Sequence, residues 1–531
     1  MRFISVSFTH FLVELDSLEE TLALFDALRH QPQTGIEEVI PAARTLLVRF
    51  QPLHTSMSLL ANALLRLPVT LVAHEQSPVM RIPVEYQGDD LAELAGVMGM
   101  TTQQVIQHHQ EAVWKVAFTG FAPGFAYLSS PDWLWKIPRR RSPRTRIPPG
   151  ALAVADVFSG IYPKASPGGW QLIGRTGLTM WDLDRPVPAT LAPGDRVQFV
   201  EHKKDKIISL PVHKPTISPP VTGDTGLNIL ATGLQALWQD AGRTGYAAMG
   251  LSASGAMDRQ ALYRANRIVG NPREYGCLEI TFGGLHIRAH QDMVMALTGA
   301  PCPLKLRTVD GEDFCLGNER PFNLAAGDEL RLGSPARGVR SYLAVRNGFM
   351  VPPVLGSCSR DTLAQLGPLP LQAGDWVQIS HHPGRSPVLI DQPPTEVLPA
   401  PGETITLDII LGPRTDWFTS ESVARLTEQS WQVTTESNRV GLRLTGAEGL
   451  VRSQTTELPS EGTCSGAIQI PANGQPVLFL RDHPVTGGYP VIAVVADYHL
   501  DRAGQIPPGA FIRFVLIQPF IELSGEPACD H

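Results

Sequence analysis

The sequence predicts a β-rich α+β protein in which barrel-like lobes follow a small N-terminal α/β module. Gly and Pro contribute 48 and 46 of the 531 residues, above their usual combined share of roughly 12 %. No Gly-X-Y period accompanies them, so tight turns between short strands explain them best. Helical periodicity also nearly vanishes after Val113. From there short apolar runs alternate with Gly/Pro turns, as in barrels and sandwiches.

The N-terminal module is expected over residues 1–78, where strand and helix signals alternate. Ile4, Val6 and Phe8 recur with a period of two, which predicts a strand. The segment Ser17–Glu20 has the pattern of a capping box before an apolar helical stripe. A second strand is predicted at 45–50 and a second helix at 54–67.

A first barrel is predicted over residues 79–211. It begins with a strand at 81–86 and a helical pair across 90–111, for which Thr101 is a candidate cap. The proline-rich stretch 212–224 is taken as a linker to a larger region at 225–531. A second proline-rich stretch, 383–402, either divides that region into two lobes or is a long internal loop.

Four segments share one plan, a Gly turn that leads into an alternating strand: 191–199, 324–332, 371–379 and 506–514. Likewise Gly168-Gly169-Trp170 parallels Gly487-Gly488-Tyr489. Such turns are common in β proteins, but two related barrel lobes explain both repeats more economically.

Composition excludes several classes of protein. The net charge of −7 makes nucleic-acid binding a poor expectation. No apolar run approaches the roughly 18–20 residues of a membrane span, and Glu14 and Asp16 interrupt any signal peptide. The six cysteines are dispersed without a Cys-x-x-Cys pair, so we expect neither disulfides nor a metal site and assign the protein to the cytoplasm.

The densest motif is Phe118–Leu128, which combines four aromatic residues with two glycines and a proline. Its glycines allow close approach of a ligand or another backbone. We select Gly120, Pro123 and Gly124 as binding residues, with a packed β-turn as the alternative.

An arginine-rich segment, 138–146, follows this motif. Guanidinium groups bind carboxylate or phosphate in a bidentate way, although such segments are more often solvated loops. We expect one anion site in the first barrel, with Arg140, Arg141 and Arg146 more exposed. The expected binding residues are Arg139, Arg144, Gly168, Gly169 and Arg175.

The second half carries polar residues among glycines. Asp258, Asp482 and His483 are the candidates for catalysis. Asp258 has an equally good interpretation as a helix N-cap, and a lone histidine in a turn is more often structural. The candidates for a second anion site are Arg243, Ser254, Asn266, Arg439, Arg443, Gly487, Gly488 and Tyr489.

Several catalytic signatures are missing from the sequence. It contains no P-loop, no H-E-x-x-H helix, no G-x-G-x-x-G turn and no Ala-Met-Lys biotin-attachment site. Cys464, in a Gly-Thr-Cys-Ser-Gly segment, precedes a β run and so does not fit a nucleophile elbow. The residues by themselves therefore indicate binding sites but no reaction.

Long motifs nevertheless resemble two known families. The segments 120–128, 138–140, 160–163, 166–170 and 174–176 resemble the allophanate hydrolase subunit 1 family, which is similar to the B subunit of bacterial 5-oxoprolinase. The segments 239–243, 254–258, 265–266, 269–271, 278–279, 439–443, 466–469 and 487–490 resemble the allophanate hydrolase subunit 2 family, which is similar to the C subunit of that enzyme. The chain thus resembles a B–C fusion, and the pair is also similar to the carboxyltransferase part of urea carboxylase.

The resemblance implies cyclophilin-like β-barrels and a B–C component of an ATP-dependent 5-oxoprolinase, which opens pyroglutamate to glutamate with a separate A component. It implies ATP, with or without magnesium, a small anionic substrate, no resident metal and no covalent biotin. The alternatives are a carboxyltransferase that serves a biotin carrier and a non-enzymatic inhibitor of a histidine kinase. Whether the chain forms a homo-oligomer stays open. Asp482-His-Pro-Val-Thr486 departs from the family's more frequent Asp-x-Gln-Thr-x, which puts the substrate in question.

Overall fold

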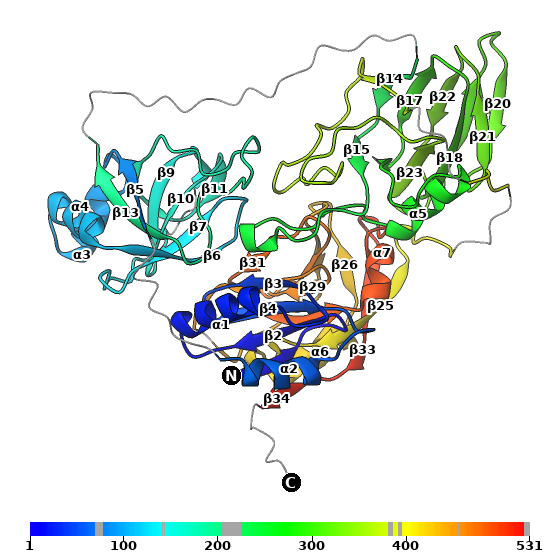
Figure 1. The fold of residues 1–531 in the computed structure, drawn as a ribbon. Helices are drawn as coiled ribbons and strands as arrows, with labels where there is room; N and C mark the ends of the chain where they lie inside the picture. The colour runs from blue at the N-terminus through cyan, green and yellow to red at the C-terminus, as the bar shows by residue number, and fades with distance from the viewer. Residues whose placement is uncertain are drawn as a thin grey trace.

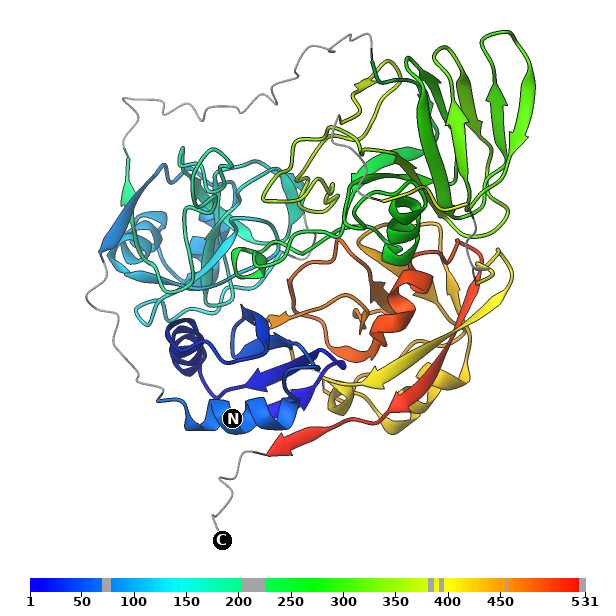
Figure 2. The same cartoon turned by 45° about the vertical axis from the view of Figure 1, so that its right-hand side comes forward.

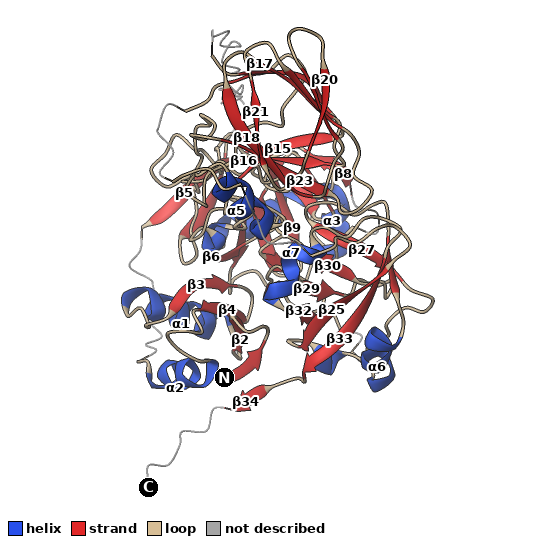
Figure 3. Cartoon of the chain, turned by 90° about the vertical axis from the view of Figure 1, so that its right-hand side faces the viewer, coloured by secondary structure: helices blue, strands red, loops and turns tan. Residues whose placement is uncertain are grey.

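The structure is a computed structural model that describes residues 1–68, 78–140, 142, 144–202, 225–380, 386–390, 396–454 and 456–524. Strands predominate, with a few short helices between them (Figure 3). An N-terminal module, a first lobe, a second lobe and a C-terminal barrel lie around a common centre (Figures 1 and 2). The predicted β-rich class is confirmed. The predicted linker at 212–224 lies outside the described residues, as do 383–385 and 391–395 of the stretch 383–402.

The N-terminal module has one sheet of order β3-β4-β2-β1-β34. Ser17 caps its first helix by accepting a hydrogen bond from the Glu20 N–H at 3.2 Å, but the predicted capping box is not complete, because Glu20 Oε2 accepts from the Asp16 N–H at 3.3 Å. The last strand comes from the other end of the chain, since Arg2 pairs with Ser524. The elements are β1 (Arg2–Ser5), β2 (His10–Glu14), α1 (Leu18–His30), β3 (Ile36–Pro41), β4 (Thr45–Phe50), α2 (Met57–Arg66) and β34 (Glu522–Ser524).

This module packs on the C-terminal barrel, a contact that the sequence does not predict. Ile4 and Leu47 lie in one apolar cluster with Ala467 and Val494 of the barrel. The buried Arg414 of the barrel also donates to Glu14 Oε1 of the module at 2.9 Å. The module and the barrel therefore share a core.

The first lobe is a nearly closed barrel, with strand order β12-β9-β10-β7-β6-β13-β5. An isolated bridge between Glu85 and Arg175 joins the two ends of this sheet. Thr101 caps α4 in a complete capping box with Gln104, as predicted. The elements are β5 (Val79–Val84), α3 (Leu91–Met98), α4 (Thr102–Glu111), β6 (Trp114–Thr119), β7 (Ala126–Ser129), β8 (Arg144–Ile147), β9 (Ala151–Ala155), β10 (Phe158–Ile161), β11 (Ser166–Gly168), β12 (Gln171–Arg175) and β13 (Arg196–Glu201).

The second lobe packs two sheets face to face, with orders β20-β19-β22-β17-β14-β24 and β15-β16-β23-β18-β21. The elements are β14 (Leu227–Thr232), β15 (Gln235–Gln239), η2 (Ala247–Met249), α5 (Arg259–Ile268), β16 (Cys277–Thr281), β17 (Leu285–Ala289), β18 (Met293–Gly299), β19 (Leu304–Arg307), β20 (Asp313–Leu316), β21 (Pro321–Leu324), β22 (Glu329–Leu332), β23 (Arg340–Val345) and β24 (Trp376–Val377).

The C-terminal lobe is a closed barrel of order β25-β32-β29-β30-β27-β26-β33. Its elements are β25 (Thr404–Leu411), η3 (Thr415–Trp417), α6 (Ser420–Glu428), β26 (Trp431–Val433), β27 (Gly441–Thr445), β28 (Glu461–Gly462), β29 (Ala467–Gln469), β30 (Val477–Phe479), β31 (Thr486–Gly487), β32 (Val491–Val495), η4 (Asp497–His499), α7 (Leu500–Ala503) and β33 (Phe511–Gln518). Within the described ranges, the helices are too short or too polar to cross a membrane.

The two barrels repeat the same construction. In each, the last strand pairs in parallel with the first, β13 with β5 and β33 with β25. Each closing strand follows a glycine with positive φ, +95° at Gly194 and +85° at Gly509. In each, a buried tryptophan after a helix, Trp114 or Trp431, donates its indole N–H to the carbonyl five residues earlier. The Gly turns at 191–199 and 506–514 therefore mark corresponding positions in two related barrels, whereas those at 324–332 and 371–379 precede β22 and β24 of the second lobe.

Candidate functional site

The motif loop 118–125 of the first lobe contacts both the second lobe and the C-terminal barrel. Thr119 Oγ1 donates to the Ala248 carbonyl at 2.6 Å, and the Gly124 N–H donates to the Met249 carbonyl at 3.4 Å. A Cβ atom on Gly120 would overlap the Thr486 hydroxyl of the barrel. Glycine is therefore required at position 120 because another part of the chain approaches closely.

The barrel side of this junction is held by an ion pair between Asp482 and Arg439. Arg439 Nε and Nη2 donate to the two carboxylate oxygens at 2.9 and 3.0 Å. Ser254 Oγ donates to Asp482 Oδ1 at 2.6 Å, and Thr362 donates its N–H and hydroxyl to Oδ2 at 2.8 and 2.7 Å. Asp482 is fully buried. The structure thus brings together three predicted residues, Ser254, Arg439 and Asp482.

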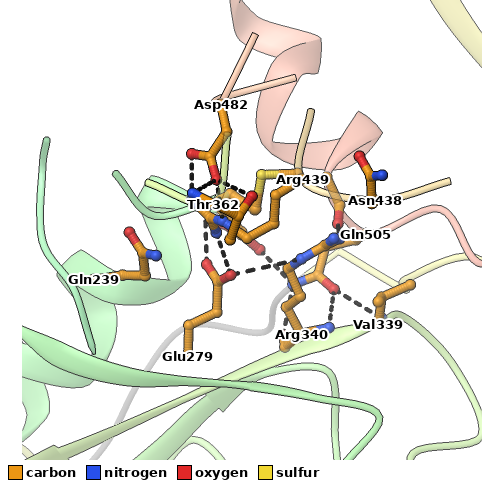
Figure 4. A network of polar contacts seen from close by, with 12 residues as sticks. Gln239, Glu279, Val339, Arg340, Thr362, Asn438, Arg439, Asp482 and Gln505 are labelled. Carbon is orange, nitrogen blue, oxygen red and sulfur yellow. Dashed lines mark hydrogen bonds and ion pairs between the residues drawn. The ribbon is translucent and has the colours of Figure 1, made fainter. Parts of the chain in front are cut away.

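Glu279, on β16, extends this network into the second lobe (Figure 4). Its Oε1 accepts a hydrogen bond from Arg439 Nη1. Its Oε2 accepts from the Met257 N–H at 3.0 Å and from the Tyr342 hydroxyl at 2.7 Å. Arg439 therefore connects a carboxylate of the second lobe to a carboxylate of the barrel.

Asp258 is a helix cap in this arrangement. Its Oδ1 accepts from the Ala261 N–H at 2.8 Å, and its Oδ2 accepts from Gln505 Nε2 at 2.9 Å. Burial, and next the charge of Asp501, raise the pKa of Asp258 to about 6. With both oxygens engaged, the predicted catalytic role of Asp258 gives way to the capping alternative.

The pKa values of the two neighbouring buried aspartates, Asp482 and Asp361, are shifted in opposite directions. Burial alone would raise the pKa of Asp482, but the charge and hydrogen bonds of Arg439 outweigh it and hold this pKa below its usual range. Burial, together with the Asp482 charge, raises the pKa of Asp361 to about 6. Asp482 is therefore an ionised and saturated carboxylate, which is a poor proton acceptor.

His483 retains the geometry of a base. Burial lowers the pKa of His483 to about 4, so the imidazole is neutral at neutral pH. Its Nδ1 lies 2.9 Å from the Pro484 carbonyl. Because a carbonyl accepts only, Nδ1 carries the proton and Nε2 presents a lone pair. His483 therefore offers a lone pair for a proton, but a pKa of about 4 makes it a weak base at neutral pH.

Thr486 lies on β31, three residues after His483. Its hydroxyl oxygen is buried and, within the described part of the chain, has no hydrogen-bond partner. It faces the position where Gly120 lacks a side chain. An unsatisfied buried hydroxyl costs about 1–3 kcal/mol, so a ligand that bonds it would recover that energy.

Lys164 joins the first lobe to the second beside Asp361. Its Nζ donates to the Leu363 carbonyl at 2.7 Å. Burial lowers the pKa of Lys164 to about 8, against the opposing charge of Asp361. The amine therefore remains largely protonated at neutral pH and contacts the loop that also supplies Thr362 to Asp482.

Arg243 lies near this loop, 3 % exposed. Its Nη2 donates to the Ser359 carbonyl, and its Nη1 has no hydrogen-bond partner among the described residues. Burial lowers the pKa of Arg243, against the charges of Asp361 and Asp240. Arg243 thus supports the loop that carries Asp361 and retains one free donor.

The prediction that Arg139, Arg144 and Arg175 form one anion site in the first lobe is wrong. Arg144 Nη1 and Nη2 donate to the carboxylate of Asp90 at 2.7 and 2.9 Å, and Arg140, expected to be exposed, bonds the same group. Arg139 and Arg175 are instead 60 % and 67 % exposed in their side chains. The arginines do not converge on one pocket because Asp90 already binds two of them.

Other predicted residues have structural positions. Gly168 pairs with Arg144 across β11 and β8, and the Gly169 carbonyl accepts the Arg140 N–H at 2.8 Å. The turn after α5 is fastened by Asn266, whose amide donates to the Arg273 and Tyr275 carbonyls. These residues are therefore not available for ligand binding.

Four more residues of the predicted second anion site lie away from the Asp482 network. Arg443 is 53 % exposed, and its closest carboxylate is Glu436 at 3.9 Å. Tyr489 is 48 % exposed and packs against the Arg452 guanidinium. Gly487 pairs with Glu461, and Gly488 lies beside the Leu458 carbonyl. Pro123 is buried in the motif loop.

Sequence reasoning missed the acidic and basic partners of the network. Glu279 belongs to a family motif, and Lys164 lies close to the arginine-rich segment, but neither position indicates the contact that the residue makes. Arg340, Asp361 and Gln505 carry no local signal. Among the described residues no group of three His, Cys, Asp or Glu side chains is placed to hold a metal ion.

Comparison with known proteins identifies the family. A family model described as "Carboxyltransferase domain, subdomain A and B" matches residues 249–516, and one described as "Carboxyltransferase domain, subdomain C and D" matches residues 1–191. The chain belongs to the carboxyltransferase-domain family. The crystal structure of TTHA0988 is similar over nearly the whole chain, with a TM-score of 0.81 and 33 % identity, covering 95 % of this chain and 99 % of that chain.

The curated relatives match the two halves separately. The C subunit of 5-oxoprolinase from Escherichia coli (strain K12) is 38 % identical over 297 residues, which cover 54 % of this chain and 90 % of that protein. The B subunit of 5-oxoprolinase from Escherichia coli O157:H7 is 42 % identical over 132 residues, which cover 24 % of this chain and 61 % of that protein. Urea amidolyase of Saccharomyces cerevisiae is 32 % identical over 312 residues, covering 55 % of this chain but 16 % of that protein. The predicted resemblance to joined B and C proteins is confirmed.

Proposed function

We propose that this chain is the joined B–C component of an ATP-dependent 5-oxoprolinase, which opens the lactam of pyroglutamate to glutamate together with a separate A-like protein. The observation that carries the proposal is the similarity of one chain to relatives of both kinds, the B and the C subunits of 5-oxoprolinase. The contact of Gly120, in the B-like part, with Thr486, in the C-like part, supports a shared site between the two.

In this proposal the substrate binds where the motif loop meets the barrel. His483 Nε2 accepts a proton, and the unsatisfied Thr486 hydroxyl donates a hydrogen bond to an oxygen of the substrate. Asp482 and Arg439 hold the turn that carries both residues and do not themselves transfer protons. The glycines of the loop allow it to pack closely against the barrel at Thr486.

Two of the predicted anion-binding arginines are not free to bind the phosphates of ATP. Those expected to bind anions most strongly, Arg144 and Arg439, are engaged by Asp90 and Asp482. We therefore assign recognition of ATP, and of any magnesium bound with it, to the A-like protein. The proposal places the complex in the cytoplasm. Free thiols are typical of that compartment, and five cysteines are free, namely Cys277, Cys302, Cys315, Cys358 and Cys464.

The test is reconstitution. The purified chain is mixed with a panel of A-like proteins, 5-oxoproline and ATP, and glutamate and ADP are quantified. We expect both products with at least one partner, and neither from the chain alone. The separate Escherichia coli proteins serve as the positive control. Absence of glutamate with every partner, while that control is active, contradicts the proposal.

Variants then test the site. His483→Gln and Thr486→Val should lower glutamate formation by at least about tenfold, within the usual range for a proton-transfer group. Arg443→Gln, an exposed change in the same barrel, is the matched control and should retain activity. Full activity in His483→Gln and Thr486→Val would move the site elsewhere.

A second candidate is a carboxyltransferase that acts with a biotin carrier protein. The description of the family itself and the similarity to urea amidolyase favour it. Because the chain has no biotin-attachment motif, this activity requires a carboxybiotin protein and should be abolished by avidin. Activity of the reconstituted system that survives avidin excludes this candidate.

A further inference from the structure

Three parts of the chain meet at η4 and α7 of the barrel. Thr9 of the N-terminal module donates its hydroxyl to Asp497 Oδ2 at 2.9 Å. The second lobe reaches the same segment through α5, which lies beside α7 (Figures 1 and 2), and the Gln260 N–H donates to Asp501 Oδ2 at 3.1 Å. From the barrel itself, Arg481 Nη2 donates to Asp501 Oδ1 at 2.8 Å. The module, the second lobe and the barrel therefore converge on one short segment.

Arg259, the first residue of α5, has no counter-charge at this meeting point. The side chain is partly buried. Its Nε is buried without a partner, whereas Nη1 and Nη2 reach solvent, and no nitrogen of this guanidinium donates a hydrogen bond to a described residue. Asp501 does not supply the missing acceptor, because Arg481 and the Gln260 N–H engage its two oxygens. A partly buried guanidinium without an acceptor is unusual, since buried charges are normally paired.

Two more guanidinium groups lie near Arg259. Arg481 binds the carboxylate that also accepts from the first turn of α5. Arg49 pairs with His10 across β4 and β2, next to the contact that Thr9 makes with the barrel. The charge of Arg481, followed by burial and with a further contribution from the charge of Arg49, lowers the pKa of Arg259 to about 10. Like charges therefore oppose one another where the three parts of the chain meet.

Both neighbouring arginines also retain donors that are not in use. Arg49 pairs through Nε with Glu37 Oε2 at 2.8 Å, and Arg481 uses only Nη2. Within the described ranges, their other side-chain nitrogens have no hydrogen-bond partner and none of these atoms is buried. Accessible donors from three arginines thus lie at one place, and only two of these arginines are compensated by a carboxylate of the protein.

We propose that Arg259, Arg481 and Arg49 bind a phosphate group, either free phosphate or the phosphate of a small monoester. A phosphate has at least three acceptor oxygens, and guanidinium groups bind it in a bidentate way. One phosphate group therefore accepts hydrogen bonds from more than one arginine and joins the parts of the chain that carry them. The proposal does not depend on the proposed function, because it uses neither His483 nor Thr486.

The test is binding of inorganic phosphate to the full chain, measured by isothermal titration calorimetry at an ionic strength held constant with sodium chloride. We expect saturable binding, which Arg259→Gln should weaken at least about tenfold because charge-assisted contacts are lost. Arg264→Gln is the matched control and should retain the affinity of the wild type, since Arg264 lies on the same helix but pairs with Glu319 at 3.4 Å. Absence of phosphate binding, or equal affinity in the two variants, overturns the proposal.

Methyl phosphate distinguishes the two sources of the phosphate group. Binding of methyl phosphate as well as inorganic phosphate, with the same loss in Arg259→Gln, assigns the site to monoesters. Binding of inorganic phosphate alone assigns it to the free ion.

Thermal unfolding gives a second measurement. Without phosphate, Arg259→Gln should melt at a higher temperature than the wild type, because the repulsion between Arg259 and Arg481 is removed. Saturating phosphate should raise the melting temperature of the wild type but not that of the variant, because a ligand that binds only the folded state stabilises it. The difference between the two proteins should therefore shrink or reverse. An arginine that contacts only solvent gives the same difference with and without phosphate, and that result overturns the proposal.

Discussion

Asp90 in the first lobe and Asp482 in the barrel are both buried aspartates bound by arginine, yet they stabilise different levels of structure. The partners of Asp90, Arg140 and Arg144, come from the same lobe and remain partly exposed, at 27 % and 22 %. The partner of Asp482, Arg439, is 3 % exposed and also bonds Glu279 of the second lobe. The first cluster therefore fastens a loop within one domain, whereas the second joins two domains.

Removing Arg439 should have the largest effect. Arg439→Met leaves Asp482 and Glu279 buried without their cation, which typically costs about 3–5 kcal/mol. We expect the free energy of unfolding, measured by chemical denaturation, to fall by that amount. Arg443→Met, at an exposed arginine four residues away, is the control and should change it by less than about 0.5 kcal/mol. Similar losses in the two variants would contradict the joining role of Arg439.

The second-largest difference between the two regions is expected in how their contributions to stability change on acidification. The pKa of His483 is lowered to about 4 in the folded protein, so its contribution to stability is present above the unfolded pKa near 6.5 and is lost as the pH falls toward 4. Asp258 and Asp361, with pKa values raised to about 6, act in the opposite sense. Comparison with the variant His483→Gln isolates the contribution of His483 to this pH dependence.

The measurement compares denaturation of the wild type and His483→Gln at pH 7 and pH 5. Between these values the wild type should lose about 1–2 kcal/mol more than the variant does. Asp90 has a pKa below its usual range, because Arg144 outweighs its burial, and so should contribute no difference over this interval. Parallel pH profiles would contradict the assignment of a buried neutral imidazole.

Arg144→Lys should have a smaller and more local effect. Lysine keeps the charge but loses the bidentate contact to Asp90, while Arg140 still holds that carboxylate. We expect a loss of about 1 kcal/mol, with faster hydrogen exchange confined to the first lobe. Faster exchange in the second lobe or the barrel would show that the Asp90 cluster is not local.

The smallest effect is expected at Arg175. Its side chain is 67 % exposed, and it pairs with Glu85 at 2.7 Å at the edge of the first barrel. Exposed ion pairs contribute about 0–1 kcal/mol, so Arg175→Ala should change the melting temperature of the protein only slightly. A loss comparable to that of Arg439→Met would assign Arg175 a structural role that its exposure does not indicate.

The sequence predicted features that depend on neighbouring residues. The caps at Ser17, Thr101 and Asp258 and the Gly turns before β13 and β33 all have short-range physical causes, so local patterns reveal them. Family motifs also indicated Arg439 and Asp482, which do meet.

Long-range partners could not be predicted in this way. Glu279 bonds Arg439 across 160 positions of the sequence, and Lys164 bonds the Leu363 carbonyl across 199. Nothing in the pattern around either residue encodes its partner. The prediction of an anion site from the arginine-rich segment failed for the same reason, because Asp90 lies 54 positions before Arg144. A basic segment indicates affinity for anions, but not whether the protein itself supplies the anion.

The strand β34 also bears on the order in which the chain is synthesised. It pairs with β1, and Glu522 binds Arg2 at 2.8 Å. The N-terminal sheet therefore receives its edge strand from residues that are synthesised about 520 positions after β1. Until then β1 presents an open edge, the kind of surface on which chains aggregate or chaperones bind.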